Sequence, residues 1–393
     1  MSRYLMIDIG AGTMDILCFD MDTGEHFKAV VMSPVRRIAR EIEQHRGPLA
    51  VTGAEMGGGP VTDVLKRRAA GSEVLISRSA AATLHHDMDR VESFGMVLAG
   101  EQQLARAVSD GTHSPIVLGD VEPARLFKII EELGPATGSE TEFEAVALCA
   151  QDHGAAPKGV SHLEFRHNLF QDMLDARPVP ASLLFSGDEV PEPFNRLKSM
   201  AQDARQLNAR EVYVMDSGMA AVTGAVRDPN ALNKAPVIIL DMATSHTVVA
   251  AMQGDQVAGM AEYHTRDITL ERIEALIREV ADGEIRHAQI LAEGGHGAYV
   301  REAVGFPNIQ AIIATGPKRS LLADSRLPIQ WGAPWGDNMM TGTVGLLEAV
   351  RRKKGLAPAD CFAMPGFSKH RSKLSSRNPD YSLPSPASGM DGS

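Results

Sequence analysis

The chain has few cysteines. Its 393 residues include three, Cys18, Cys149 and Cys361, and each is far from the others in the sequence. Without a CxxC or CxxxCxxC spacing, the sequence holds neither a zinc ribbon nor a cysteine site for an iron–sulfur cluster. Isolated, reduced thiols are typical of cytoplasmic proteins, so we expect that location.

An excess of positive charge and long apolar segments are also lacking. Lys and Arg number 39 against 50 Asp and Glu, for a net charge of −11, and no basic patch indicates a nucleic-acid partner. No apolar stretch approaches the roughly 20 residues that cross a bilayer. The first residues run directly into a strand pattern, without a signal-peptide core. The sequence therefore predicts no membrane partner.

The length and the order of elements predict two α/β lobes. A chain of 393 residues exceeds the size at which single cores usually divide. A run of three strands and a helix opened by Ser33-Pro34 is followed, in the second half, by three more strands and a helix. Asp120 is expected to cap a further helix, which ends at Gly134. The expected strands are 3–9, 14–20, 26–32, 237–241, 247–252 and 256–261.

Composition divides the chain further. We expect a first lobe at 1–226 and a second at 236–354 with a returning C-terminal helix. Within the first lobe, proline and charge increase over about 151–200, which predicts a peripheral subdomain. Residues 366–393 are rich in serine, proline and charge, so they are expected to be a disordered tail.

A glycine-rich turn follows the first predicted strand. Residues 8–15 read Asp-Ile-Gly-Ala-Gly-Thr-Met-Asp, so a carboxylate ends the strand and a hydroxyl lies in the turn. Glycines at 10 and 12 permit positive φ and remove Cβ, which lets backbone N–H groups approach a phosphate. Asp8 is a ligand of the type that Mg²⁺ takes alongside water and phosphate oxygens. Taken alone, the pattern also fits a plain tight hairpin.

A related turn recurs at residues 237–247. An apolar strand ends at Asp241, and Met-Ala-Thr-Ser-His-Thr follows. Ala243 stands where a glycine is expected; alanine is small enough for close approach but resists positive φ. Hydroxyls at 244, 245 and 247 can compensate as donors. Two such turns facing each other would clamp one polyphosphate, with a plain hairpin turn as the alternative.

Five segments follow one another along the chain. They are the turn at 8–15, a small-residue helix at 216–226, the turn at 237–247, the strand that leads to Gly316, and a small-residue helix at 342–350. This order resembles the actin-like ATPase superfamily, which contains actin, the heat-shock chaperones and the sugar kinases, over about residues 3–354. The resemblance implies an α/β fold of two ribonuclease-H-like lobes with ATP and Mg²⁺ in the cleft between them. It also implies that the small-residue helices cross closely and act as a hinge.

Within that superfamily, Asp-Ile-Gly-Ala-Gly-Thr and Glu-Gly-Gly-His-Gly are similar to a prokaryotic family of unknown function. Some members carry a label of pyruvate-formate-lyase activation. A radical-SAM activase needs a CxxxCxxC cluster site, and this sequence has none. We therefore do not expect electron-transfer activation.

The resemblance also implies roles for individual residues. It places Asp8 and Asp241 at the metal, and Asp216 with Asp8 at the catalytic centre, where Asp216 orients water or accepts a proton. The alternative for Asp216 is a helix N-cap. Gly316 lies in the expected adenosine loop, although Pro317 replaces the second glycine. The implied nucleotide-binding residues are Gly10, Ala11, Gly12, Thr13, Ala243, Thr244, Ser245, Thr247, Gly316, Lys318 and Arg319.

The predicted function is an ATP-binding protein, either a Mg²⁺-dependent phosphoryl-transfer enzyme or an ATPase, that acts on an unidentified small molecule. The alternative is a regulatory ATPase that opens and closes on a protein partner. A filament-forming relative is least favoured, because long insertions with apolar loops are lacking. The sequence specifies neither the acceptor nor the oligomeric state.

Two groups of residues keep two interpretations each. The glycine-rich loop Glu293–Gly297 either contacts nucleotide or substrate, or is a flexible connection. His153, His162 and His167 either form a substrate pocket or are solvated surface histidines.

Overall fold

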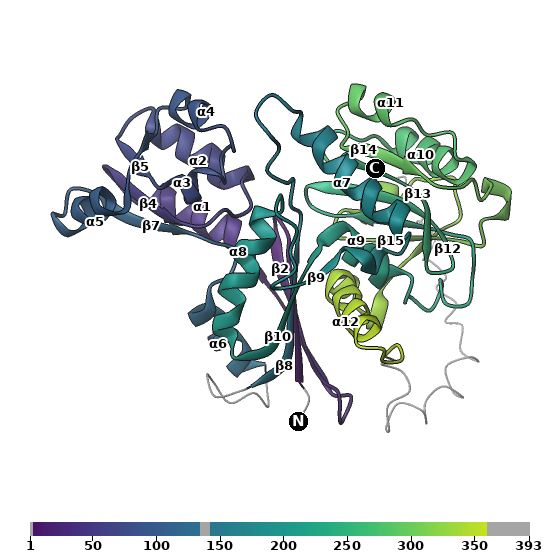
Figure 1. Cartoon of the computed structure of the whole chain (residues 1–393). Helices are drawn as coiled ribbons and strands as arrows, with labels where there is room; N and C mark the ends of the chain where they lie inside the picture. The colour runs from purple at the N-terminus through teal and green to yellow at the C-terminus, as the bar shows by residue number, and fades with distance from the viewer. Residues whose placement is uncertain (1–2, 134–141, 360–393) are drawn as a thin grey trace, which may run out of the picture. The chain divides into compact units, whose positions relative to one another are not determined.

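The computed structural model describes residues 3–133 and 142–359 (Figure 1). Its first six-stranded sheet has the order β3-β2-β1-β8-β10-β9. The first three strands are antiparallel neighbours, whereas β8 and β10 run parallel to β1. The strands are β1 (Arg3–Ile9), β2 (Thr13–Asp20), β3 (His26–Met32), β8 (Phe143–Ala150), β9 (Leu184–Ser186) and β10 (Ala209–Asp216).

The second six-stranded sheet has the order β14-β13-β12-β11-β15-β16. Here too the first three strands in sequence are antiparallel neighbours, and the next two in the sheet are parallel to the first. The strands are β11 (Val237–Met242), β12 (His246–Gln253), β13 (Gln256–His264), β14 (Gly297–Val300), β15 (Ala311–Thr315) and β16 (Ile329–Trp331).

The two sheets therefore repeat one topology. The order β3-β2-β1-β8-β10 corresponds strand for strand, and direction for direction, to β13-β12-β11-β15-β16. This is the ribonuclease-H-like arrangement, present twice, of the actin-like ATPase fold, and the expected fold class is confirmed. In each copy the hairpin tip after the first strand lies at the same end of its sheet, next to the carboxyl end of the parallel neighbour.

Helices α9 (Ser217–Ala225) and α12 (Thr341–Lys353) pack against each other beside these sheets (Figure 1). A Cβ on Gly224 would lie 1.9 Å from the carbonyl oxygen of Thr341, and one on Gly345 would lie 1.8 Å from that of Ala220. Only glycine permits this backbone contact. The close helix crossing predicted from the small residues is confirmed.

A third sheet, which the sequence pattern did not reveal, lies between β3 and β8 in the chain. Its four strands are parallel in the order β6-β5-β4-β7 and are covered by short helices (Figure 1). Its core packs valine, leucine and isoleucine from strands and helices together. The elements are β4 (Leu49–Gly53), α2 (Gly59–Ala69), β5 (Val74–Ile76), α3 (Arg78–Ala81), α4 (Met88–Ser93), β6 (Val97–Leu98), α5 (Glu101–Ser109) and β7 (Ser114–Leu118).

The remaining helices connect the strands. Ser33 caps α1 as expected, with its hydroxyl accepting from the N–H of Val35. The prediction for Asp120 is wrong, because the following helix begins at Pro123 and Asp120 instead binds Arg196. The helices are α1 (Pro34–Gln44), α6 (Pro123–Glu132), α7 (His162–Ala176), α8 (Asn195–Ala204), α10 (Leu270–Asp282) and α11 (His287–Ala292).

The segment 151–200 contributes β9 to the edge of the first sheet, where it pairs with β10. None of the helices in residues 3–133 and 142–359 has the length and apolarity needed to cross a membrane. The expected helix end at Gly134, the thiol of Cys361 and the tail at 366–393 lie outside the described residues.

Candidate functional site

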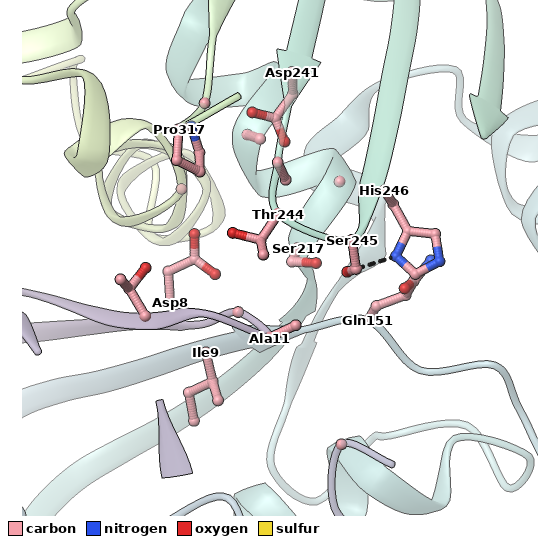
Figure 2. A pocket seen from close by; sticks show the side chains of 18 of the residues that line it. Asp8, Ile9, Ala11, Gln151, Ser217, Asp241, Thr244, Ser245, His246 and Pro317 are labelled. Carbon is pink, nitrogen blue, oxygen red and sulfur yellow. Dashed lines mark hydrogen bonds between the residues drawn. The ribbon is translucent and has the colours of Figure 1, made fainter. Parts of the chain in front are cut away.

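A cavity of about 240 Å³ lies where the tips of two hairpins meet. One tip joins β1 to β2, and the other joins β11 to β12. Figure 2 shows side chains from both tips around the same space. The residues expected from the sequence that line this cavity are Asp8, Gly10, Ala11, Thr13, Asp241, Ala243, Thr244, Ser245 and Gly316.

The first tip needs its glycines for space rather than for an unusual backbone angle. Neither Gly10 nor Gly12 has a positive φ, which differs from the expectation. A Cβ on Gly12 would lie 3.0 Å from Oγ1 of Thr244, on the second tip. A Cβ on Gly10 would lie 3.3 Å from the carbonyl oxygen of Thr13. The missing Cβ of Gly12 therefore lets the two tips approach each other, and that of Gly10 lets the first tip close on itself.

The second tip closes without glycine. Ala243 has an ordinary negative φ, and its N–H donates to the carbonyl oxygen of His246, so alanine causes no strain there. The glycine that this tip requires comes from the end of β15. Gly316 has φ +89, and a Cβ there would lie 2.5 Å from the backbone of Met242 and 2.9 Å from Oδ1 of Asp241. Gly316 thus brings the loop after β15 against the second tip.

Four carboxylates line the cavity: Asp8, Asp15 and Asp241 near the hairpin tips, and Glu262, which is paired with Arg166. Asp15 and Asp241 are 6% and 9% exposed, so their charged forms are poorly solvated. Burial first, and the charge of Asp8 second, raise the pKa of Asp241 to about 7 and that of Asp15 to about 8. Burial also raises the pKa of Asp8 to about 6. Such a concentration of negative charge favours a cation.

Unsatisfied oxygens support the same conclusion. Oδ1 of Asp15 and Oδ1 of Asn338 are buried and have no hydrogen-bond partner, although both residues line the cavity. Asp241 accepts one hydrogen bond, from the hydroxyl of Thr315 at 3.3 Å. A buried oxygen that accepts no hydrogen bond destabilises the folded state unless an ion or a water molecule binds to it. The oxygen-rich set suits a hydrated Mg²⁺, which needs one or two carboxylates alongside water and phosphate.

Asp216 is buried one layer behind the cavity. Its Oδ1 accepts from the N–H of Met219 at 3.0 Å, as an N-cap of α9, and its Oδ2 lies 3.2 Å from Nη2 of Arg166. Arg166 also binds Glu262, with Nη1 2.6 Å from Oε2. Burial opposes ionisation of Glu262, but the charge of Arg166 outweighs it and lowers the pKa of Glu262 to about 2. Arg166 and Glu262 line the cavity, whereas Asp216 reaches it through Arg166.

The other expected nucleotide-binding residues lie at the margin. Thr247 is buried and its hydroxyl pairs with that of Thr265 at 3.0 Å. Lys318 is exposed, and its N–H donates to the carbonyl oxygen of Met242. Arg319 donates to the carbonyl oxygen of Gly332 and its guanidinium lies 5.6 Å from the ring centre of Trp331. Lys318 and Arg319 thus flank the loop at Gly316 without lining the cavity.

Several cavity residues were not identified from the sequence. Asp15 lies in the first motif, but its inward orientation follows from the register of β1 and β2, in which it faces Asp8. Gln151 comes directly after the apolar strand β8, a position that could have marked it. The spacing of apolar residues that predicts a helix does not indicate which of its arginines are buried. His153, one of the histidines considered for a substrate pocket, also lines the cavity, and the cavity residues missed from the sequence are Asp15, Gln151, Arg166, Arg196, Glu262 and Asn338.

The family model described as "Putative pyruvate format-lyase activating enzyme (DUF1786)" matches residues 56–321. The description agrees with the family predicted from the sequences of two glycine-rich motifs, Asp-Ile-Gly-Ala-Gly-Thr and Glu-Gly-Gly-His-Gly. The sequence matches none of the curated proteins with which it was compared.

Three solved structures illustrate the structural similarity. A PilM-PilN type IV pilus biogenesis complex has 12% identity and a TM-score of 0.37, covering 88% of this chain and 98% of that one. The AlfA filament from a B. subtilis plasmid has 10% identity and a TM-score of 0.36, with the same coverage. MreB5 of Spiroplasma citri bound to ADP has 10% identity and a TM-score of 0.35, covering 91% and 99%.

Proposed function

The chain belongs to the DUF1786 family, and we propose that it is a Mg²⁺-dependent ATP-binding protein that transfers or hydrolyses the terminal phosphate. One observation carries this proposal: two hairpin tips from separate, topologically equivalent sheets meet at one cavity, each with a strand-end carboxylate, Asp8 and Asp241. Duplicated tips of this kind offer backbone N–H groups and hydroxyls to opposite sides of a polyphosphate.

In this proposal each part of the cavity has a separate task. Asp8 and Asp241 hold Mg²⁺, directly or through water, and Asp15 adds negative charge beside them. The metal, when bound, neutralises charge on the phosphate oxygens. The backbone at 10–13 and 243–245 and the hydroxyls of Thr13 and Thr244 orient the phosphates. The loop at Gly316 supports the nucleoside.

The buried network behind the cavity supplies the remaining positioning. Asp216 and Glu262 hold the Arg166 guanidinium in a fixed plane at the cavity wall. A fixed guanidinium of this type stabilises charge that develops on a transferred phosphoryl group. We propose that Asp216 contributes through Arg166, as a positioning residue. Direct action of Asp216 as a base would require Arg166 to move away.

A small-molecule acceptor has room next to this site. A second cavity of about 1040 Å³ shares Gly57, Gln151, His153 and Arg196 with the first. Its lining includes charged side chains such as Glu55, Arg90 and Lys158. Its volume is at the upper end of the roughly 300–1,000 Å³ typical of ligand pockets. We place the acceptor, for a phosphoryl-transfer enzyme, in this second cavity.

A regulatory ATPase is the second candidate function. The close crossing of α9 and α12 through Gly224 and Gly345 supports it, because helices in backbone contact can pivot with little side-chain rearrangement. In that case hydrolysis is slow, a protein partner accelerates it, and protease protection depends on the nucleotide. The two candidates therefore differ in what accelerates turnover.

Calorimetry with ATP, with and without Mg²⁺, tests the proposal. We expect saturable binding that requires Mg²⁺, followed by release of ADP. A metabolite panel then separates a kinase, in which one acceptor accelerates ADP formation, from a regulatory ATPase, in which none does. Absence of nucleotide binding at millimolar ATP and Mg²⁺ would overturn the proposal.

A further inference from the structure

Three histidines gather at one wall of the first cavity, and the proposed nucleotide chemistry uses none of them. His153 follows β8, His246 begins β12 and His296 precedes β14. One side-chain nitrogen of each lies within 4.8 Å of those of the other two. His153 and His246 line the cavity, and Figure 2 shows the ring of His246 beside Ser245. The three side chains form a converging set from separate parts of the chain.

Two members of this set, His246 and His296, each have one hydrogen-bonded ring nitrogen and one without a partner. Nδ1 of His246 lies 2.9 Å from the hydroxyl of Ser245, and Nε2 of His296 lies 3.1 Å from Nε2 of His264. Nε2 of His246 and Nδ1 of His296 are buried without a hydrogen-bond partner. Metal-binding histidines have this arrangement: one ring nitrogen binds the metal, and the other is hydrogen-bonded to a neighbouring group.

The glycine-rich loop at 293–297 explains how His296 reaches this position. A Cβ on Gly295 would lie 2.6 Å from the side chain of Ile290 and 3.0 Å from the carbonyl oxygen of Glu262. The N–H of His296 donates to that same carbonyl oxygen. Gly297 has φ +126, which a side chain rarely permits. The glycines thus press the loop against β13 and direct His296 toward the other two histidines.

We propose that His153, His246 and His296 bind a divalent transition metal ion, with Zn²⁺ the preferred ion. Three imidazoles with a fourth position open to the cavity are the ligand set of catalytic zinc sites. Mg²⁺ prefers oxygen ligands, so this site and the carboxylate site select different metals. The open position faces the space where the phosphates of a nucleotide are proposed, and a water molecule or an anionic oxygen would occupy it.

Two further properties of the cluster bear on this assignment. His296 is 5% exposed and His246 is half-buried, so neither imidazole is fully hydrated. Bonds of about 2.0–2.1 Å to a tetrahedral Zn²⁺ hold the nitrogens about 3.3 Å apart. The three nitrogens lie within 4.8 Å of one another, so metal binding in this proposal requires His153, which lies outside the helices and strands, to move toward the other two.

The carboxylate of Glu262 does not compete for this position. Its Oε1 is 3.8 Å from Nδ1 of His296, which is beyond a hydrogen bond. Its oxygens are bound by Arg166 and Gln151. At this separation Nδ1 of His296 makes no hydrogen bond to Glu262, so it stays available to a metal ion.

Cobalt substitution tests this inference on the full chain. After removal of metals by a chelator, one equivalent of Co²⁺ should give the intense visible bands of a four-coordinate site, and Zn²⁺ should displace it. His246→Ala and His296→Ala should each weaken binding by at least about 100-fold, since even outer-partner substitutions cost about 10–100-fold. His113→Ala, which changes a histidine that precedes β7 and pairs with Glu73, should bind as the wild type does.

Two further variants keep the outcome clear. Because His153 lies outside the sheets, His153→Gln tests the metal site even if His246→Ala, a change in β12, lowers the melting temperature. Asp8→Asn should keep Co²⁺ binding and lose Mg²⁺-dependent ATP binding, which separates this inference from the proposed function. Wild-type protein that binds Co²⁺ no more tightly than the folded His153→Gln variant would overturn the inference.

Discussion

Gly342, on the first turn of α12, leaves the space that the carboxylate of Asp8 occupies. A Cβ on Gly342 would lie 2.0 Å from Oδ2 of Asp8. Helix α12, the second helix of the crossing pair, thus forms the wall behind the carboxylate of Asp8 in the first sheet. The orientation of Asp8 therefore depends on a residue more than three hundred positions away along the chain.

The first prediction follows from this contact. Gly342→Ala should displace Asp8 or shift α12, because a side chain cannot share that space. We expect a loss of stability of about 1–3 kcal/mol, as for other overpacked sites. The affinity for ATP with Mg²⁺ should fall at least about tenfold, which is 1.4 kcal/mol. Thermal melting and calorimetry measure the two effects. Gly71→Ala is the matched control, since no atom lies within 4 Å of its Cβ position.

The second prediction separates ligand binding from folding. Asp241→Asn removes one of the charges that repel each other around the cavity but keeps the shape of the side chain. We expect a protein that is at least as stable as the wild type above pH 7 and whose affinity for ATP with Mg²⁺ falls at least about tenfold. Chemical denaturation and calorimetry would show this. Asp110→Asn, at the exposed C-terminal end of α5, should change neither. Loss of stability together with unchanged affinity would contradict the role of Asp241.

The third prediction concerns pH. An acid whose pKa is raised by folding keeps its proton longer in the folded state, so the free energy of unfolding decreases as pH rises past its ordinary pKa. Asp241 and Asp15 have folded pKa values of about 7 and about 8. Below pH 6.5, the histidines with lowered pKa values act in the opposite direction, because the unfolded state binds their protons first.

Without metal and nucleotide, the contribution of these two carboxyl groups to stability should therefore fall by about 2 kcal/mol between pH 6.5 and 8. Denaturant titrations at each pH measure the slope. Asp15→Asn should reduce the slope, because it removes the group that titrates last in this window. An equal slope in wild type and variant would show that Asp15 is not the source.

The fourth prediction distinguishes the two roles of Asp216. Asp216→Asn keeps an oxygen for the N–H of Met219 but removes the charge beside Arg166. If Asp216 positions Arg166, kcat should fall while KM for ATP stays within about threefold, since the group acts in the transition state. Arg166→Lys should show the same split, because lysine lacks the planar fork. Wild-type turnover in the Asn variant would leave Asp216 as a helix cap only.

Local rules explain why much of the fold could be predicted. The strands at 3–9 and 26–32 and the Ser33 cap follow from alternation, apolar runs and capping chemistry, all of which act between near neighbours. The same holds for the two hairpin tips, since each has its glycine or small residues, hydroxyls and carboxylate within a few positions. The third sheet was not predicted as a unit, because two of its strands, Val74–Ile76 and Val97–Leu98, are too short to carry a periodic signal.

The amino-acid sequence by itself determined the duplicated strand order, the two strand-end carboxylates and the small residues that let α9 and α12 touch. Only the tertiary structure decided which groups share a cavity. The register of β2 turned Asp15 inward, and a helix glycine gave Asp8 its space. Two loops and the start of β12 brought His153, His246 and His296 together. Such contacts join residues far apart in the chain, and their geometry depends on packing distances that no local pattern encodes.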